Sequence, residues 1–234
     1  MSASTLLRRR HGYRLRFLGK ADAMVEPDMG KVRKLLRLHR KSFYAAAAFA
    51  ADTEHPVPSD TRAWSQILAS LLTGIHGIAR RKGADLADGS DVKAANVWLA
   101  IDTPRFNGCL KAGRKGEPGG IHTLDEMPYL FFVMWDTEPQ QARNRCRVWV
   151  VCPGQDRVFR AMAATWYRQR EAGIIRSDNF QLHPPRNLDS DVFRNTCGNL
   201  TYPLLFRADW TGTDYEIVTF DPSVLTSGSC SSAD

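Results

Sequence analysis

Two aspartates and a lysine lie close together between Gly83 and Lys93, and their types and spacing suit the hydrolysis of a phosphodiester. Asp91 and Lys93 are two positions apart, so on a β-strand both side chains leave the same face. Asp85 precedes a turn and can approach Asp91 from a neighbouring strand. A hard cation such as Mg²⁺ takes oxygen ligands and is usually held by one or two carboxylates together with substrate phosphate. The segment therefore predicts a Mg²⁺ site on Asp85 and Asp91, with Lys93 as a third catalytic residue.

Other groups of the same segment bear on this site. The backbone carbonyl of Val92 lies close enough to serve as a further metal ligand. The ammonium group of Lys93 can orient or deprotonate the attacking water and can stabilise charge on the phosphate. Asp88 is the alternative first metal ligand, but Asp85 is favoured because Asp88-Gly89 is typical of a turn.

Two helices are predicted ahead of this segment. Residues 29–51 carry apolar side chains on one side and basic side chains on the other. The second helix follows a cap at Ser59 or Asp60, and its apolar residues step by three and four, which places them on one face. Gly83 is predicted to end it in the left-handed conformation. The apolar face consists of Trp64, Ile67, Leu68, Leu71, Leu72, Ile75, Ile78 and Ala79.

Strands are predicted around and after the acidic segment, and the whole order indicates an α/β fold with a helical N-terminal region and extra C-terminal strands. Two of the strands are nearly continuous in apolar side chains, which indicates burial on both faces. The expected strands cover 84–86, 91–101, 129–135, 145–151, 204–210 and 215–220, and a further helix covers 156–171.

The motif resembles that of the PD-(D/E)XK nucleases, and within them the type II restriction endonucleases. Asp91-Val92-Lys93 matches the (D/E)XK half in full. Ala84-Asp85 stands where Pro-Asp would be, and the gap to Asp91 is shorter than usual for the family. The resemblance covers Ser59 to Glu171, and it implies an αβββαβ core with a mixed central sheet.

This resemblance also implies an activity. Mg²⁺ on Asp85 and Asp91 would polarise the scissile phosphate, and water positioned by Lys93 would attack in line and leave a 5′-phosphate. The substrate would be double-stranded DNA, cut at a specific sequence. A palindromic site would suit a homodimer, in which each subunit cuts one strand.

The distribution of charge also favours a polyanionic partner. The net charge is +7, but residues 1–50 alone sum to +9, so the rest of the chain is slightly acidic. Contacts between basic side chains and phosphates supply most non-specific affinity for DNA. A solvated helix face is the plain structural explanation for part of this charge. The expected phosphate contacts of the N-terminal arm are Arg8, Arg9 and Arg10.

Two later segments carry candidate DNA contacts. Arg105 and Asn107 follow the motif strand, and loops at strand ends often carry function. A segment broken by Pro184-Pro185 is extended and rich in side chains that read bases, since Arg suits guanine and Gln or Asn suits adenine. Its candidates are Gln181, His183, Arg186 and Asn187.

The chain is expected to comprise a basic arm and helix over 1–58, a catalytic core with recognition elements over 59–222, and a serine-rich disordered tail over 223–234. The five cysteines are scattered and form no CxxC pair, which argues against a zinc finger and a disulfide scaffold. No apolar run is long enough to span a membrane, and no nucleotide-binding fingerprint is present. A cytoplasmic protein without a nucleotide cofactor is the expectation.

Two other functions fit the same sequence. A structure-selective nuclease for DNA repair or junction resolution would use the same catalytic core and read DNA shape. A non-catalytic DNA-binding protein would keep the basic surface but would not depend on a divalent metal. The long C-terminal half favours the restriction enzyme, because reading a base sequence needs more recognition elements.

Overall fold

The computed structural model describes most of the chain between residues 26 and 225. The predicted contacts Arg8, Arg9, Arg10, Arg186 and Asn187 lie outside the described residues. No helix in the described part is long and apolar enough to cross a membrane. The described residues are 26–55, 57, 60–78, 83–96, 105–114, 117–138, 144–184, 191–195 and 198–225.

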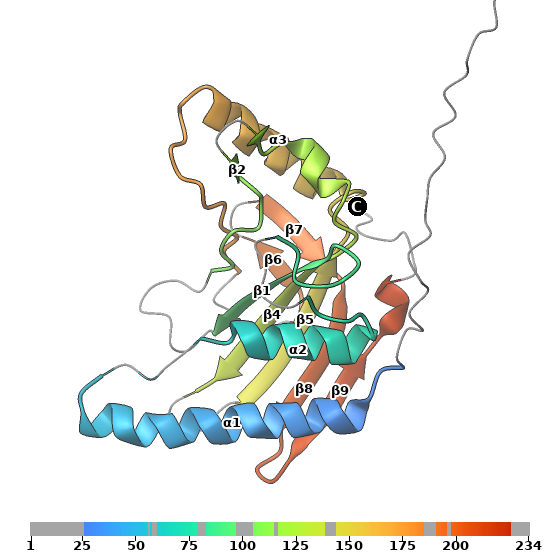
Figure 1. The fold of residues 1–234 in the computed structure, drawn as a ribbon. Coiled ribbons are helices and arrows are strands. Elements are labelled where there is room, and N and C mark those ends of the chain that lie inside the picture. Colours follow the sequence, from blue (N-terminus) through green and yellow to red (C-terminus); the bar gives the residue numbers. More distant parts are fainter. Residues whose placement is uncertain are drawn as a thin grey trace, which may run out of the picture.

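A five-stranded mixed sheet forms the centre of the molecule (Figure 1). β1 and β4 pair in parallel, the other neighbours pair antiparallel, and β1 lies at one edge. The main elements follow one another as α2, β1, β4, β5, α3 and β8, which is the expected αβββαβ order. The predicted α/β class with a mixed central sheet is therefore confirmed. In spatial order the strands are β1 (Asp91–Asn96), β4 (Leu130–Thr137), β5 (Asn144–Val151), β8 (Leu204–Trp210) and β9 (Tyr215–Phe220).

Helices cover both faces of this sheet (Figure 1). α1 (Met29–Asp52) and α2 (Arg62–Thr73) pack their apolar sides on one face. α3 (Arg157–Glu171) packs on the other. Every residue of β4 and β5 is buried, which confirms the prediction made from their apolar runs.

Helix ends explain most of the observed boundaries. The side chain of Asp28 accepts a hydrogen bond from the N–H of Lys31 at 3.0 Å and begins α1, as the predicted break before residue 29 suggested. α2 ends earlier than predicted. Gly74 takes a left-handed φ of 72° and donates its N–H to Ser70, so Gly74 and not Gly83 terminates the helix.

Several smaller elements complete the described fold. The predicted strand over 84–86 was wrong, because only an isolated bridge between Gly77 and Leu86 forms there. Cys109 and Cys146 are free and buried, whereas Cys152 is disulfide-bonded, which the cysteine spacing did not suggest. The small elements are β2 (Gly113–Arg114), β3 (Glu117–Pro118), η1 (Ile121–Leu124), β6 (Phe193–Asn195), β7 (Gly198–Tyr202) and η2 (Pro222–Leu225). η2 covers the start of the expected tail, and residues 226–234 lie outside the described part.

Candidate active site

Asp91 and Lys93 are the first and third residues of the edge strand β1. Their partners in β4 are Leu130 and Phe132, so both side chains project toward the face that α3 covers. The Lys93 Nζ lies 2.9 Å from the Asp91 Oδ2, with 16% and 7% of the two side chains exposed. The predicted shared face is confirmed, and the pair is nearly shielded from water.

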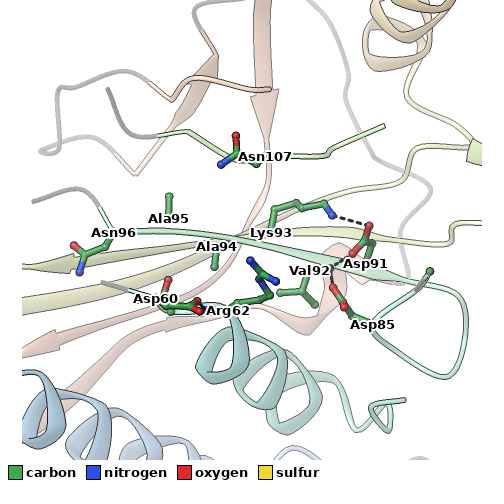
Figure 2. Close-up of a pocket in the computed structure, with 12 residues that line it drawn as sticks. Asp60, Arg62, Asp85, Asp91, Val92, Lys93, Ala94, Ala95, Asn96 and Asn107 are labelled. Carbon is green, nitrogen blue, oxygen red and sulfur yellow. Dashed lines mark hydrogen bonds and ion pairs between the residues drawn. The ribbon is translucent and has the colours of Figure 1, made fainter. Parts of the chain in front are cut away.

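Asp85 reaches the same place from the turn that precedes β1 (Figure 2). The N–H groups of Asp85 and Leu86 both donate to the carbonyl of Ser90, which closes the turn. The Asp85 Oδ2 accepts the N–H of Val92 at 2.9 Å, and the Asp91 Oδ1 accepts the same N–H at 2.9 Å. One backbone donor therefore brings the two carboxylates together.

Asp88 is held in the turn and does not join this pair. Its Oδ1 accepts the N–H of Ser90 at 2.9 Å, and its Oδ2 accepts the Ser90 hydroxyl at 2.8 Å. Both oxygens of Asp88 thus stabilise the turn around Gly89, whose φ is 100°. The structure places Asp85, and not Asp88, beside Asp91.

Gln66 of α2 also contacts this pair, and the sequence analysis missed it. Its Nε2 donates to the Asp85 Oδ1 at 2.6 Å. Each Asp85 oxygen therefore receives one hydrogen bond, from Gln66 on one side and Val92 on the other. No periodic signal could have paired residues 66 and 85, because the contact depends on how α2 packs beside β1.

The surroundings of Asp85 disfavour its ionised form. Burial, which removes water, and the adjacent Asp91 carboxylate together raise the pKa of Asp85 to about 7. The Val92 N–H and the Lys93 ammonium oppose that rise. Two carboxylates this close repel each other when both are charged, and a divalent cation between them would remove the repulsion.

The donor set fits Mg²⁺. The N–H of Val92 points away from β4 toward Asp85, and in a strand the carbonyl of a residue points to the same side as its N–H. The Val92 carbonyl therefore lies at the free edge of β1, on the same side as the N–H that both carboxylates accept. Within the described ranges, no group of three or more His, Cys, Asp or Glu side chains could hold a metal. Mg²⁺ needs only one or two carboxylates, because it retains waters and binds substrate phosphates.

A cavity of about 350 Å³ opens at these residues, and we call it the β1 cavity (Figure 2). It extends from the carboxylates along β1 and between the N-terminus of α2 and the loop at Asn107. Asp60 and Arg62, which the sequence analysis did not select, form the α2 side. The lining residues are Asp60, Thr61, Arg62, Gly83, Asp85, Asp91, Val92, Lys93, Ala94, Ala95, Asn96 and Asn107.

The two predicted DNA-contact segments meet at the rim of the β1 cavity. Phe106 and Leu182 form an antiparallel bridge with N···O distances of 2.9 and 3.1 Å. This bridge sets Asn107 beside Gln181, whose Nε2 donates to the Asn107 Oδ1 at 2.8 Å. Arg105 is exposed next to the bridge, and His183 is half-buried on its other side.

Comparison with known proteins places these features in a family. The model of the MamI restriction endonuclease family matches residues 48–213, which include α2 and every strand of the main sheet except β9. The Type II restriction enzyme MamI of Microbacterium ammoniaphilum is 36% identical over 165 residues, or 66% of this chain and 53% of that enzyme. The chain thus spans about half the length of this curated relative. No solved structure matches the chain. With more than half of its residues matched by the family model, the chain belongs to the MamI restriction endonuclease family.

Proposed function

We propose that this chain is a sequence-specific endonuclease that hydrolyses phosphodiester bonds of double-stranded DNA with the help of Mg²⁺. The observation that carries the proposal is the meeting of Asp85 and Asp91 at the N–H of Val92, with Lys93 2.9 Å from Asp91. Membership of the MamI restriction endonuclease family supports the same activity. The curated relative is a type II restriction enzyme.

Each residue has a separate task in this proposal. Asp85, Asp91 and the Val92 carbonyl hold Mg²⁺. When bound, the ion supplies Lewis-acid stabilisation of the phosphate and a more acidic water. Lys93 keeps a cation at the mouth of the β1 cavity, where it orients the attacking water and stabilises charge on the phosphate. Gln66 is a positioning residue that fixes the Asp85 carboxylate.

The proposed DNA path runs over the rim of the β1 cavity. Arg105, Asn107, Gln181 and His183 lie around the Phe106–Leu182 bridge and would contact the duplex. The proposal extends to Arg186, Asn187 and the arm residues Arg8, Arg9 and Arg10. It places the catalytic core and its recognition elements in residues 59–222. It also includes a homodimer, so that two sites cut the two strands, and a cytoplasmic location.

The test is cleavage of phage DNA by the purified chain, with Mg²⁺ or with EDTA. We expect discrete fragments that require Mg²⁺ and that disappear in Asp91→Asn and Lys93→Met. Asp125→Asn is the matched control, because Asp125 pairs with Arg160 on the α3 side and does not line the β1 cavity. It should cut as the unmodified chain does.

Two other outcomes would replace the proposed function with a different one. Metal-dependent smearing, or cutting only at branched DNA, would replace the proposal with a structure-selective repair nuclease. Salt-sensitive binding without any cleavage, on DNA from several unmodified sources, would indicate a non-catalytic DNA-binding protein.

A further inference from the structure

Three amide side chains form a hydrogen-bonded cluster at the rim of the β1 cavity. Asn107 lines the cavity, and Asn179 and Gln181 approach it from the segment paired through Leu182. The backbone supports this arrangement, because the N–H of Cys109 donates to the carbonyl of Phe180 at 3.0 Å. Asn107 and Asn179 are exposed, but the hydrogen bond between their side chains fixes the orientation of both.

The hydrogen bonds determine which way each asparagine amide is turned. The N–H of Gly108 donates to the Asn179 Oδ1 at 2.7 Å, and a backbone N–H can only donate. The NH₂ group of Asn179 must therefore face Asn107, and it donates to the Asn107 Oδ1 at 3.1 Å. Gln181 donates to that same oxygen at 2.8 Å. The Asn107 oxygen thus accepts two hydrogen bonds within the protein.

This orientation leaves the NH₂ group of Asn107 as the part that can meet a ligand. An amide that reads adenine must offer both its oxygen and its NH₂ group. Asn107 in this orientation offers only a donor, which suits an acceptor such as a phosphate oxygen or a purine N7. Its position is close to the proposed chemistry, since a Cβ built on the neighbouring Gly108 would lie 4.0 Å from the Lys93 Nζ. Figure 2 shows Asn107 across the β1 cavity from Asp60 and Arg62.

We propose that Asn179 is a positioning residue that holds Asn107 as a hydrogen-bond donor to an acceptor atom of the DNA in the β1 cavity. The inference rests on the proposed function and adds a residue outside the predicted contact set. It also makes Asn107 a donor to DNA and excludes the two-point contact by which an amide reads adenine. Fixing the amide in advance lowers the entropy lost when DNA binds.

Asn179→Asp is the variant that tests this chain of hydrogen bonds. One carboxylate oxygen of the substituted side chain can still accept the Gly108 N–H. The other oxygen would face Asn107 and force its amide to turn its NH₂ group inward. Asn107 would then present an oxygen to the DNA in place of a donor. Ile174→Asp is the matched control, because it adds the same charge to the same exposed segment at a side chain that is 72% exposed and lies outside the amide cluster.

Binding to duplex DNA and cleavage of phage DNA are both measured, with thermal unfolding as a check of the fold. Loss of a hydrogen bond to a charged acceptor typically lowers affinity or kcat/KM roughly tenfold or more. We expect Asn179→Asp and Asn107→Ala each to show that loss, and Ile174→Asp to show much less. The double variant Asn107→Ala/Asn179→Asp should be no worse than Asn107→Ala/Ile174→Asp, which carries the same charge, because Asn179 acts through Asn107. A structural role of Asn179 alone would instead give additive losses.

The fragment pattern identifies the acceptor. An unchanged pattern with slower cleavage means a phosphate oxygen, and extra fragments mean a base. The inference is overturned if Asn179→Asp binds and cuts as the unmodified chain does, or if the two losses add. The proposed function fails separately, when the unmodified chain binds DNA but never cuts it. In that case the measurement of binding to duplex DNA still tests the role of Asn179.

Discussion

At the scale of single residues, the candidate site depends on one backbone N–H. Val92 donates to Asp85 and to Asp91, and this shared donor holds two carboxylates together although they repel each other. The pKa of Asp85 is raised because of burial and because of Asp91. Bringing like charges together costs stability, and a cation at this place, as we propose, would remove that cost.

The first prediction concerns metal-linked stability. A ligand that binds only the folded state stabilises it by about 2.7 kcal/mol when its concentration is one hundred times Kd. Adding Mg²⁺ should therefore raise the Tm of the unmodified chain. Asp91→Asn should abolish the rise, and Asp125→Asn should retain it. Thermal unfolding across a Mg²⁺ titration is the measurement, and an equal rise in all three proteins would place the ion elsewhere.

The second prediction concerns Gln66. Its hydrogen bond to Asp85 orients a proposed metal ligand, and loss of such a supporting contact typically weakens metal binding or activity roughly tenfold to hundredfold. Gln66→Ala should show this loss in a metal titration of the cleavage rate. Ile67→Ala, at an exposed neighbouring position of α2, is the control for altered helix propensity. Normal metal dependence in Gln66→Ala would show that Asp85 needs no such support.

At the scale of elements, α1 packs on the sheet and carries a buried histidine at this contact. His39 is 4% exposed and its ring lies 4.0 Å from that of Trp135 and 5.4 Å from that of Trp64. Its Nδ1 is buried without a hydrogen-bond partner among the described residues. Burial therefore lowers the pKa of His39 to about 4. The helix packs best when this imidazole is neutral.

The third prediction follows from that pKa. Between pH 6.5 and 4 the unfolded chain binds a proton at His39 that the folded chain does not bind, so acid favours unfolding. The contribution of His39 to the free energy of unfolding should fall by up to about 3 kcal/mol as the pH decreases through this range, while the raised pKa of Asp85 acts in the opposite direction. Urea unfolding at several pH values measures the fall. His39→Phe should lose less stability in acid than the unmodified chain does, and His122→Phe, at an exposed position, should follow the unmodified chain.

At the scale of the whole molecule, the candidate site lies on β1, which is one of the two edge strands of the sheet. Helices cover both faces of the sheet, and β4 and β5 are buried throughout (Figure 1). β1 is an edge strand, so its backbone and its polar side chains can meet a long substrate. Arg62 of α2 and Asn107 of the loop then enclose the β1 cavity from its two sides.

The fourth prediction concerns how salt affects DNA binding. Each phosphate that the protein neutralises contributes about −0.9 to the slope of log K against log salt concentration. We expect a steep slope for the unmodified chain. Arg105→Gln should reduce its magnitude by about one, with Arg168→Gln on α3 as the control. Fluorescence anisotropy with duplex DNA provides the slopes, and identical slopes would remove Arg105 from the interface.

Much of this arrangement was predictable, because it depends on local periodicity. The period of two in β-strands placed Asp91 and Lys93 on one face, and the continuous apolar runs indicated that β4 and β5 are central. Asp88-Gly89 was recognisable as a turn, which left Asp85 for the site. The end of α2 was not predictable from the apolar spacing, because that pattern continues beyond Gly74 into Ile75 and Ile78.

The sequence by itself indicated the residues of the proposed chemistry: two carboxylates and a lysine, with Asp91 and Lys93 on one strand. Only the tertiary structure decided which partners complete the site. Gln66 meets Asp85 across 19 positions and Asn179 meets Asn107 across 72. Such contacts arise from the packing of α2 beside β1 and from the Phe106–Leu182 bridge. Local propensities act over a few residues, so they cannot predict contacts that form only once the chain has folded.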